Sequence, residues 1–112
     1  MRIHELFLAM AKHNASDLHL KVGEPPIFRI NGELVRMKSP ALTAEDTEGM
    51  LTPMMNERAK HDLETRGYAD FSQALEGAGR YRCNVFRSCG KLSAAVRRVN
   101  RVEGGKSAAL RL

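Results

Sequence analysis

The stretch that decides the fold is YADFSQALEGAGRYRCNVFRSCGKLSAAVRRV, residues 68–99. It contains three segments in which apolar and polar residues alternate, at 68–75, 80–87 and 91–99, and short glycine-containing segments separate them. Alternation of this kind is typical of strands that bury one face and expose the other. Because connections this short join adjacent antiparallel strands, the stretch predicts an antiparallel sheet.

Upstream of this stretch, the sequence predicts one helix and three more strands. One face of a helix within residues 3–14 is formed by Ile3, Leu6, Phe7, Met10 and Ala11. The strand patterns that follow are DLHLKV at 17–22, IFRI at 27–30 and ELVRM at 33–37. In the first of these, Leu18, Leu20 and Val22 point inward. The dipeptide Asn31-Gly32 favours a type I′ hairpin turn between the other two.

Two further helices are predicted between the two groups of strands. Thr43 as N-cap and Asp46 three residues later come close to a capping box, and this helix runs to about residue 52, before Pro53. The other helix covers about residues 56–66, with Asn56 as N-cap and Gly67 just after its end. Three methionines of this region are expected to fill the core, namely Met50, Met54 and Met55.

The complete order of elements is therefore α-β-β-β-α-α-β-β-β. It predicts the α+β class, with an antiparallel sheet of about six strands and helices on one face. The 112 residues correspond to one small domain, and 43% apolar and 28% charged residues are typical of a soluble globular protein. No apolar run approaches the ~18 residues of a membrane span, so we expect a cytoplasmic protein without a transmembrane segment.

Cysteine usage agrees with a reducing compartment. Cys83 lies on the apolar face of its strand and is expected to be buried, whereas Cys89 lies in a turn beside Gly90 and is expected to be a free thiol. A disulfide between them is not expected in the cytosol.

The charge is distributed unevenly along the chain. The net charge is +5, but residues 1–78 carry 9 Lys or Arg against 12 Asp or Glu, a net −3, and residues 79–112 carry 9 against 1, a net +8. A local excess of this size indicates an anionic partner, such as nucleic acid, phosphate or the acidic surface of a neighbour. The alternative is a solvated basic edge that keeps the protein soluble.

The arginines of the last two strands are candidates for that anion. Arg80 and Arg82 share the polar face of 80–87, and the alternation puts either Arg97 or Arg98 on the same face. Two guanidinium groups facing each other across strands repel, and a phosphate between them removes the repulsion. The alternative is that each arginine pairs with a carboxylate of the same domain, such as Asp70 or Glu76.

Two other patterns carry less chemistry. Asp17 and His19 share an exposed strand face, with Arg29 opposite on a neighbouring strand, which favours a surface charge network over a metal or general-base site. Gly105-Lys106-Ser107 lacks the earlier glycine of a phosphate-binding loop, because Asn100 stands in its place. Residues 100–112 are therefore interpreted as a linker or tail.

The stretches ASDLHLKVGEPPIFRINGEL, DFSQALEGAGRYRCNVFR and LSAAVRRV together resemble the N-terminal domain of the type IV pilus retraction ATPases, the PilT family of secretion ATPases. The resemblance covers about residues 1–99 and implies a PAS-like domain. It also implies a RecA-like ATPase domain, not contained in this chain, which binds ATP and Mg²⁺ and carries the Walker motifs. By itself, this chain is expected to bind no cofactor and to hydrolyse no ATP.

The resemblance also implies partners and site residues. The partners are the RecA-like domains of the same and neighbouring subunits in a homo-hexamer, and a platform protein at the bacterial inner membrane, where the assembled motor is peripheral. By their place in the motif, Arg82 and Arg97, and more weakly Arg80, match arginines that reach the phosphates of ATP. This role requires guanidinium groups that have no acidic partner inside the domain, and direct nucleic-acid binding is not expected.

Two alternatives stay open at this point. A small nucleic-acid-binding module would use the basic last third of the chain, although Tyr81 and Phe86 are the aromatic residues available for stacking there. A PAS-type sensor would instead hold a ligand inside its core.

Overall fold

The computed structural model of the chain describes residues 2–77 and 79–99. Its elements in chain order are α1 (Ile3–Lys12), β1 (Asp17–Leu20), β2 (Ile27–Ile30), β3 (Glu33–Arg36), α2 (Ala44–Leu51), a 3₁₀ turn η1 (Thr52–Met54), α3 (Glu57–Arg66), β4 (Tyr68–Leu75), β5 (Gly79–Ser88) and β6 (Lys91–Val99). The α+β class and the order of helices and strands predicted from the sequence are confirmed. The interpretation of residues 100–112 as a linker or tail falls outside the described residues.

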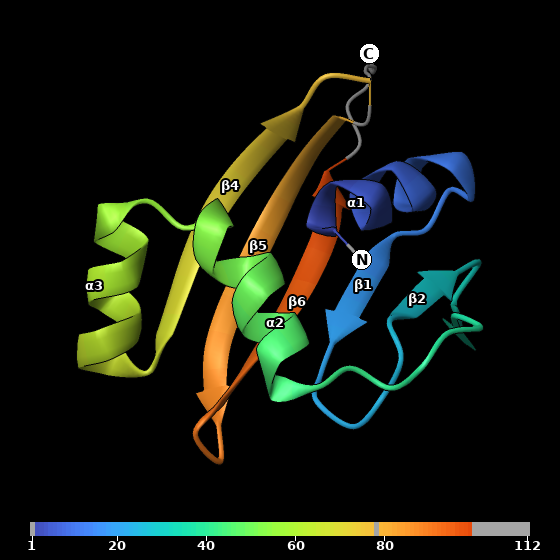
Figure 1. Cartoon of the computed structure of the whole chain (residues 1–112). Helices are drawn as coiled ribbons and strands as arrows, with labels where there is room; N and C mark the ends of the chain where they lie inside the picture. Colours follow the sequence, from blue (N-terminus) through green and yellow to red (C-terminus); the bar gives the residue numbers. More distant parts are fainter. Residues whose placement is uncertain (1, 78, 100–112) are drawn as a thin grey trace.

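The strands form one antiparallel sheet in the order β3-β2-β1-β6-β5-β4. Among the described residues, the first strand, β1, and the last strand, β6, are therefore neighbours in the middle of the sheet. Figure 1 shows α1 and α2 in front of the sheet and α3 beside the edge strand β4. Within the described part of the chain, the rear of the sheet carries no helix, and we call this side the open face.

Local sequence signals explain the main boundaries. Asn31 and Gly32 have φ of 52° and 82°, as the predicted type I′ turn requires. The hydroxyl of Thr43 accepts from the backbone N–H of Asp46 at 3.1 Å, and the Asp46 carboxylate accepts from the backbone N–H of Thr43 at 2.8 Å, which completes the capping box. Asn56 caps α3, and Gly67 ends it at a φ of 85°.

The structure sets the ends of three predicted elements within one or two residues of the expected positions. Helix α1 ends at Lys12, because Asn14 takes a left-handed φ of 55°. Strand β1 ends at Leu20, and the half-buried Val22 lies in the turn that leads to β2. Helix α2 ends at Leu51, and the chain tightens into the 3₁₀ turn at Pro53, whose ring cannot continue an α-helix interior.

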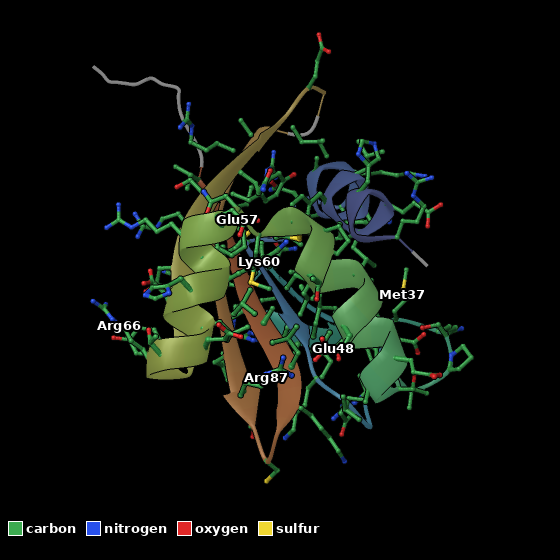
Figure 2. The ribbon with its side chains drawn as sticks, turned by 60° about the vertical axis from the view of Figure 1, so that its left-hand side comes forward. Met37, Glu48, Glu57, Lys60, Arg66 and Arg87 are labelled. Carbon is green, nitrogen blue, oxygen red and sulfur yellow. The ribbon has the colours of Figure 1, made fainter. Side chains whose placement is uncertain are left out.

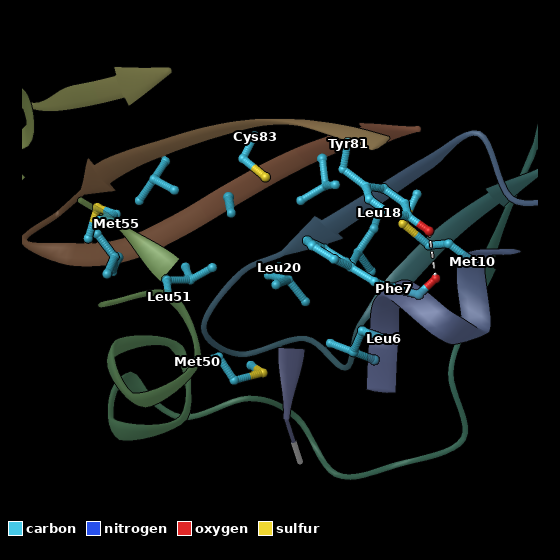
Figure 3. Close-up of a cluster of buried hydrophobic side chains, with 14 of the residues drawn as sticks. Leu6, Phe7, Met10, Leu18, Leu20, Met50, Leu51, Met55, Tyr81 and Cys83 are labelled. Carbon is cyan, nitrogen blue, oxygen red and sulfur yellow. Dashed lines mark hydrogen bonds between the residues drawn. The ribbon is translucent and has the colours of Figure 1, made fainter. Parts of the chain in front are cut away.

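The core lies between the helical face of the sheet and the helices α1 and α2 (Figure 3). Tyr81 on β5 is fully buried; its ring stacks on Phe7 of α1 with 4.4 Å between centroids, and its hydroxyl donates to the Phe7 carbonyl at 2.9 Å. Met50 and Met55 are buried and Met54 is partly buried against the cluster, so the methionines fill the core as predicted. No helix of the described residues is long and apolar enough to cross a membrane.

The side chains of Arg87 and Arg98 lie on the helical side of the sheet. Arg87 on β5 forms an ion pair with Glu48 on α2, and the two side chains point toward each other in Figure 2. Arg98 on β6 donates to the side-chain oxygen of Asn14 at 3.0 Å. Both guanidinium groups therefore have partners within the domain and fasten its elements together.

Candidate functional site

A row of four charged residues crosses the open face of the sheet. Arg82 on β5 lies directly opposite Arg97 on β6. Arg97 is also opposite Asp17 on β1, and Asp17 is opposite Arg29 on β2. From β2 through β1 and β6 to β5, the charges are therefore positive, negative, positive and positive. We call these four residues the charged row.

The pairing of Arg82 with Arg97 follows from the turn between β5 and β6. Ser88 pairs with Lys91, so the turn consists of two residues, Cys89 and Gly90, with φ of 54° and 78°. A two-residue turn of this type fixes the register of both strands. The sequence left the choice between Arg97 and Arg98 open, and this register puts Arg97 on the open face.

Arg97 is not free of acidic partners, contrary to what its predicted role required. Its Nε donates to Oδ1 of Asp17 at 3.3 Å. The partner is neither Asp70 nor Glu76, the two carboxylates considered from the sequence. The contact uses only one edge of the guanidinium, and the Arg97 side chain is 75% exposed. Its outer nitrogens are therefore available to a second anion.

Arg82 has no ion pair or side-chain hydrogen bond within residues 2–77 and 79–99. Asp70, a suggested partner, instead accepts a hydrogen bond from the amide nitrogen of Asn84 at 2.7 Å. Arg80 lies two residues before Arg82 on β5 and on the same face, opposite Val99 and Ala74. In the described part of the chain, its side chain likewise has no ion pair or hydrogen bond. The structure therefore places all three predicted arginines on one face.

Asp17 is the centre of the charge network predicted for this strand. Its Oδ2 lies 3.7 Å from Nε of Arg29 and accepts from the Ser16 hydroxyl at 2.7 Å. Partial burial by itself raises the pKa of Asp17, but the hydrogen bond from Ser16 and the hydrogen bond and charge of Arg97 outweigh it, so the pKa lies below its ordinary value. Asp17 is therefore a carboxylate at neutral pH.

The charged row borders a pocket of about 300 Å³ on the open face. The polar residues that line it are Asp17, His19, Asp70, Arg82, Asn84 and Arg97. The small side chain of Ala95 lies between His19 and Asn84 and leaves the floor open. Within residues 2–77 and 79–99, no three His, Cys, Asp or Glu side chains are grouped so that they could hold a metal ion. Two guanidinium groups at a concave surface instead suit an oxyanion.

The sequence pattern missed the contact between Asp17 and Arg97. Each residue alternates correctly on its own strand, but 80 positions separate them in the chain. The contact could be predicted only by considering the two stretches together, because both residues belong to stretches on which the family resemblance rests. Nothing in either stretch alone indicates that β1 pairs with β6.

The chain is similar in sequence to ATPases of type IV pili. It is 37% identical over 86 residues to the type IV pilus retraction ATPase PilT of Pseudomonas aeruginosa, an alignment that covers 77% of this chain and 25% of that protein. It is 26% identical over 99 residues to the type IV pilus ATPase PilU of the same organism, covering 88% of this chain and 26% of PilU. The chain thus spans about a quarter of the length of these relatives. No protein-family model matches it.

The fold agrees with these relatives. A crystal structure of the pilus retraction motor PilT with bound ADP matches the chain with a TM-score of 0.82 and 39% identity, covering 89% of this chain and 29% of that one. Sequence and fold therefore agree along most of the chain. The chain belongs to the PilT family of ATPases and has the fold of their N-terminal domain.

Proposed function

We propose that this chain is the N-terminal domain of a hexameric pilus-retraction motor, and that its open face supplies Arg82 and Arg97 to the phosphates of ATP. The nucleotide and Mg²⁺ are held by a RecA-like ATPase domain of the same or a neighbouring subunit. In this proposal the assembled motor lies in the cytoplasm against the inner membrane, where it contacts a platform protein of the pilus machine. Arg80 extends the same basic surface in a supporting role.

One observation carries the proposal. Arg82 and Arg97 lie opposite each other, and the described part of the domain contributes a single carboxylate, Asp17, to the pair. Like charges on directly opposite residues destabilise a sheet, so an anion between them is favourable. Arginine offers paired N–H donors that match the oxygens of phosphate, a geometry that lysine lacks.

The chemical consequence concerns charge. Phosphoryl transfer spreads negative charge over the oxygens of the γ-phosphate, and a guanidinium placed against them lowers the barrier. The same contact favours closure of the two domains around ATP. When the γ-phosphate leaves, much of the attraction between the arginines and the nucleotide is lost. The closed arrangement of the two domains is then no longer favoured over the open one. Hydrolysis is in this way coupled to movement between domains.

The test is ATP turnover by the full-length protein that joins this domain to its ATPase domain. We expect Arg82→Ala and Arg97→Ala each to lower kcat by about 100-fold, the size of effect seen when one transition-state donor is removed. Arg82→Lys keeps the charge but loses the paired donors, so its kcat should fall between those of the wild type and Arg82→Ala.

The matched control is Arg66→Ala on α3. Arg66 is exposed and, in Figure 2, points away from the sheet, so its loss removes the same charge without touching the open face. Its kcat should stay within about twofold of the wild type. The proposal fails if the variants at Arg82 and Arg97 keep full turnover while their circular dichroism shows an intact fold.

A further inference from the structure

The charged row contains one carboxylate between two guanidinium groups. Oδ1 of Asp17 faces Arg97 and Oδ2 faces Arg29, so the two arginines bind different oxygens. The Asp17 side chain is only 16% exposed. A carboxylate in such a position needs partners, because leaving a partly buried charge unpaired is costly.

The two arginines are held differently. Arg29 is 41% exposed, and its Nη1 also donates to the backbone carbonyl of Gly32 at 3.0 Å, which ties it to the β2–β3 turn. Arg97 is 75% exposed, and within the described residues Asp17 provides its only side-chain hydrogen bond. Arg97 is therefore free to turn away from Asp17 while Arg29 stays in place.

We propose that Asp17 is a positioning residue. It is the counter-ion of Arg97 in the nucleotide-free domain, and when nucleotide binds, Arg97 leaves Asp17 and contacts phosphate instead. Arg29 and the Ser16 hydroxyl continue to satisfy the carboxylate after the exchange. This inference rests on the proposed function, because it assigns a regulating role at the same site. Its physical content is a competition between one carboxylate and a polyphosphate for one guanidinium.

The competition has a predictable direction. In the resting domain, Asp17 neutralises Arg97 and so reduces its repulsion with Arg82. When phosphate arrives, the carboxylate must lose Arg97 and then lies near a second anion, and both changes oppose binding. Asp17 therefore weakens phosphate binding and favours release, so that only a densely charged anion recruits both arginines.

The experiment measures binding of inorganic tripolyphosphate to this chain at low ionic strength, where surface charges are weakly screened. Titrations are followed by NMR through the side-chain Nε–Hε signals of the arginines. We expect Asp17→Asn to bind about fivefold more tightly than the wild type, the size of effect of one unit charge near a protein surface. Asp17→Glu keeps the charge and should bind within about twofold of the wild type.

Asp62→Asn is the matched control, because it makes the same change of charge on α3, where Asp62 forms no ion pair within the described residues. Its affinity should change by less than about twofold. In an Arg97→Ala background, Asp17→Asn should give a clearly smaller gain than in the wild type. An equal gain would show that Asp17 repels phosphate without acting through Arg97, and would overturn the inference.

A measurement on the unaltered chain covers the case in which Asp17→Asn does not fold. The hydrogen bond from Ser16 and the contact with Arg97 together lower the pKa of Asp17. Because the exchange removes Arg97, saturation with tripolyphosphate should raise that pKa and shift the Nε–Hε signal of Arg97. Arg29, Arg97 and His19 are the charged or titratable groups that face Asp17 from its neighbouring strands and its own. An unchanged pKa at saturation overturns the exchange.

The outcomes also separate this inference from the proposed function. Suppose that tripolyphosphate binds and Arg82→Ala abolishes binding, but Asp17→Asn binds no more tightly than the wild type. The counter-ion role of Asp17 is then wrong, and the phosphate-binding role of the arginines stands. If tripolyphosphate binds with the same affinity to the wild type and to a variant lacking both Arg82 and Arg97, the phosphate site itself is wrong, and the role of Asp17 falls with it.

Discussion

Cys83 and Cys89 lie on the same strand and the turn that follows it, yet their surroundings are opposite. Cys83 is buried in the core, and burial raises the pKa of its thiol to about 12. Cys89 is exposed at the tip of the β5–β6 hairpin. Because the thiolate is the reactive form, burial of Cys83 suppresses its chemistry at neutral pH.

We therefore expect the native chain to react with one equivalent of iodoacetamide at pH 8. Mass spectrometry of digested protein should locate the label on Cys89, and unfolding in urea should bring the total to two equivalents. Cys89→Ser should leave the folded chain almost unlabelled over the same period. Rapid labelling of Cys83 in that variant would show that the β5 strand opens far more readily than its burial implies.

At the scale of single elements, α2 shows how one cap links stability to pH. Hydrogen bonds from the backbone N–H and then the side chain of Thr43 lower the pKa of Asp46 below its unfolded value of 3.8. Because the folded pKa is the lower one, the carboxylate contributes stability above pH 3.8. That contribution is lost as the pH falls through the folded pKa.

The prediction compares Asp46→Asn with the wild type by urea unfolding between pH 2 and 7. The variant should be less stable at pH 7, and the difference should shrink steadily below about pH 4 as the wild-type carboxylate is protonated. Glu64→Gln on α3 is the control, since Glu64 is exposed and forms no ion pair in the described part of the chain. A difference for Asp46→Asn that stays constant with pH would contradict the capping role of the charge.

At the scale of the whole molecule, one core joins the N-terminal helix to the last two described strands. Leu6 of α1 is 0% exposed and packs within the cluster that includes Tyr81 and Val96 of the last strands. Leu8, two residues further along the same helix, is 40% exposed. The N-terminal helix therefore stabilises a sheet whose longest strands come from the other end of the sequence.

We expect Leu6→Ala to lower the free energy of unfolding by about 3 kcal/mol, the usual cost of a large-to-small change in a packed core. Leu8→Ala should cost less than about 1 kcal/mol, since its side chain is already partly in water. Urea unfolding followed by circular dichroism and by amide signals of β1 and β6 should give one coincident transition. Separate transitions for helix and sheet would show that α1 is not part of a single cooperative core.

The sequence by itself determined the elements and the faces of the strands. Thr43 and Asp46 define the start of α2, and Asn31-Gly32 defines the hairpin of β2 and β3. Alternation in β5 separates Arg80 and Arg82 from Tyr81 and Cys83. These features were predictable because each depends on residues a few positions apart, whose hydrogen bonds and periodicity are local.

Only the tertiary structure decided which acidic residue lies beside Arg97. The pairing of β1 with β6 brings Asp17 against Arg97 from 80 positions away in the chain. Strands distant in sequence find their register by burying a shared core, and a shift of one residue turns every side chain to the opposite face. That choice is made by the packing of the whole sheet against its helices, and local sequence patterns do not contain it.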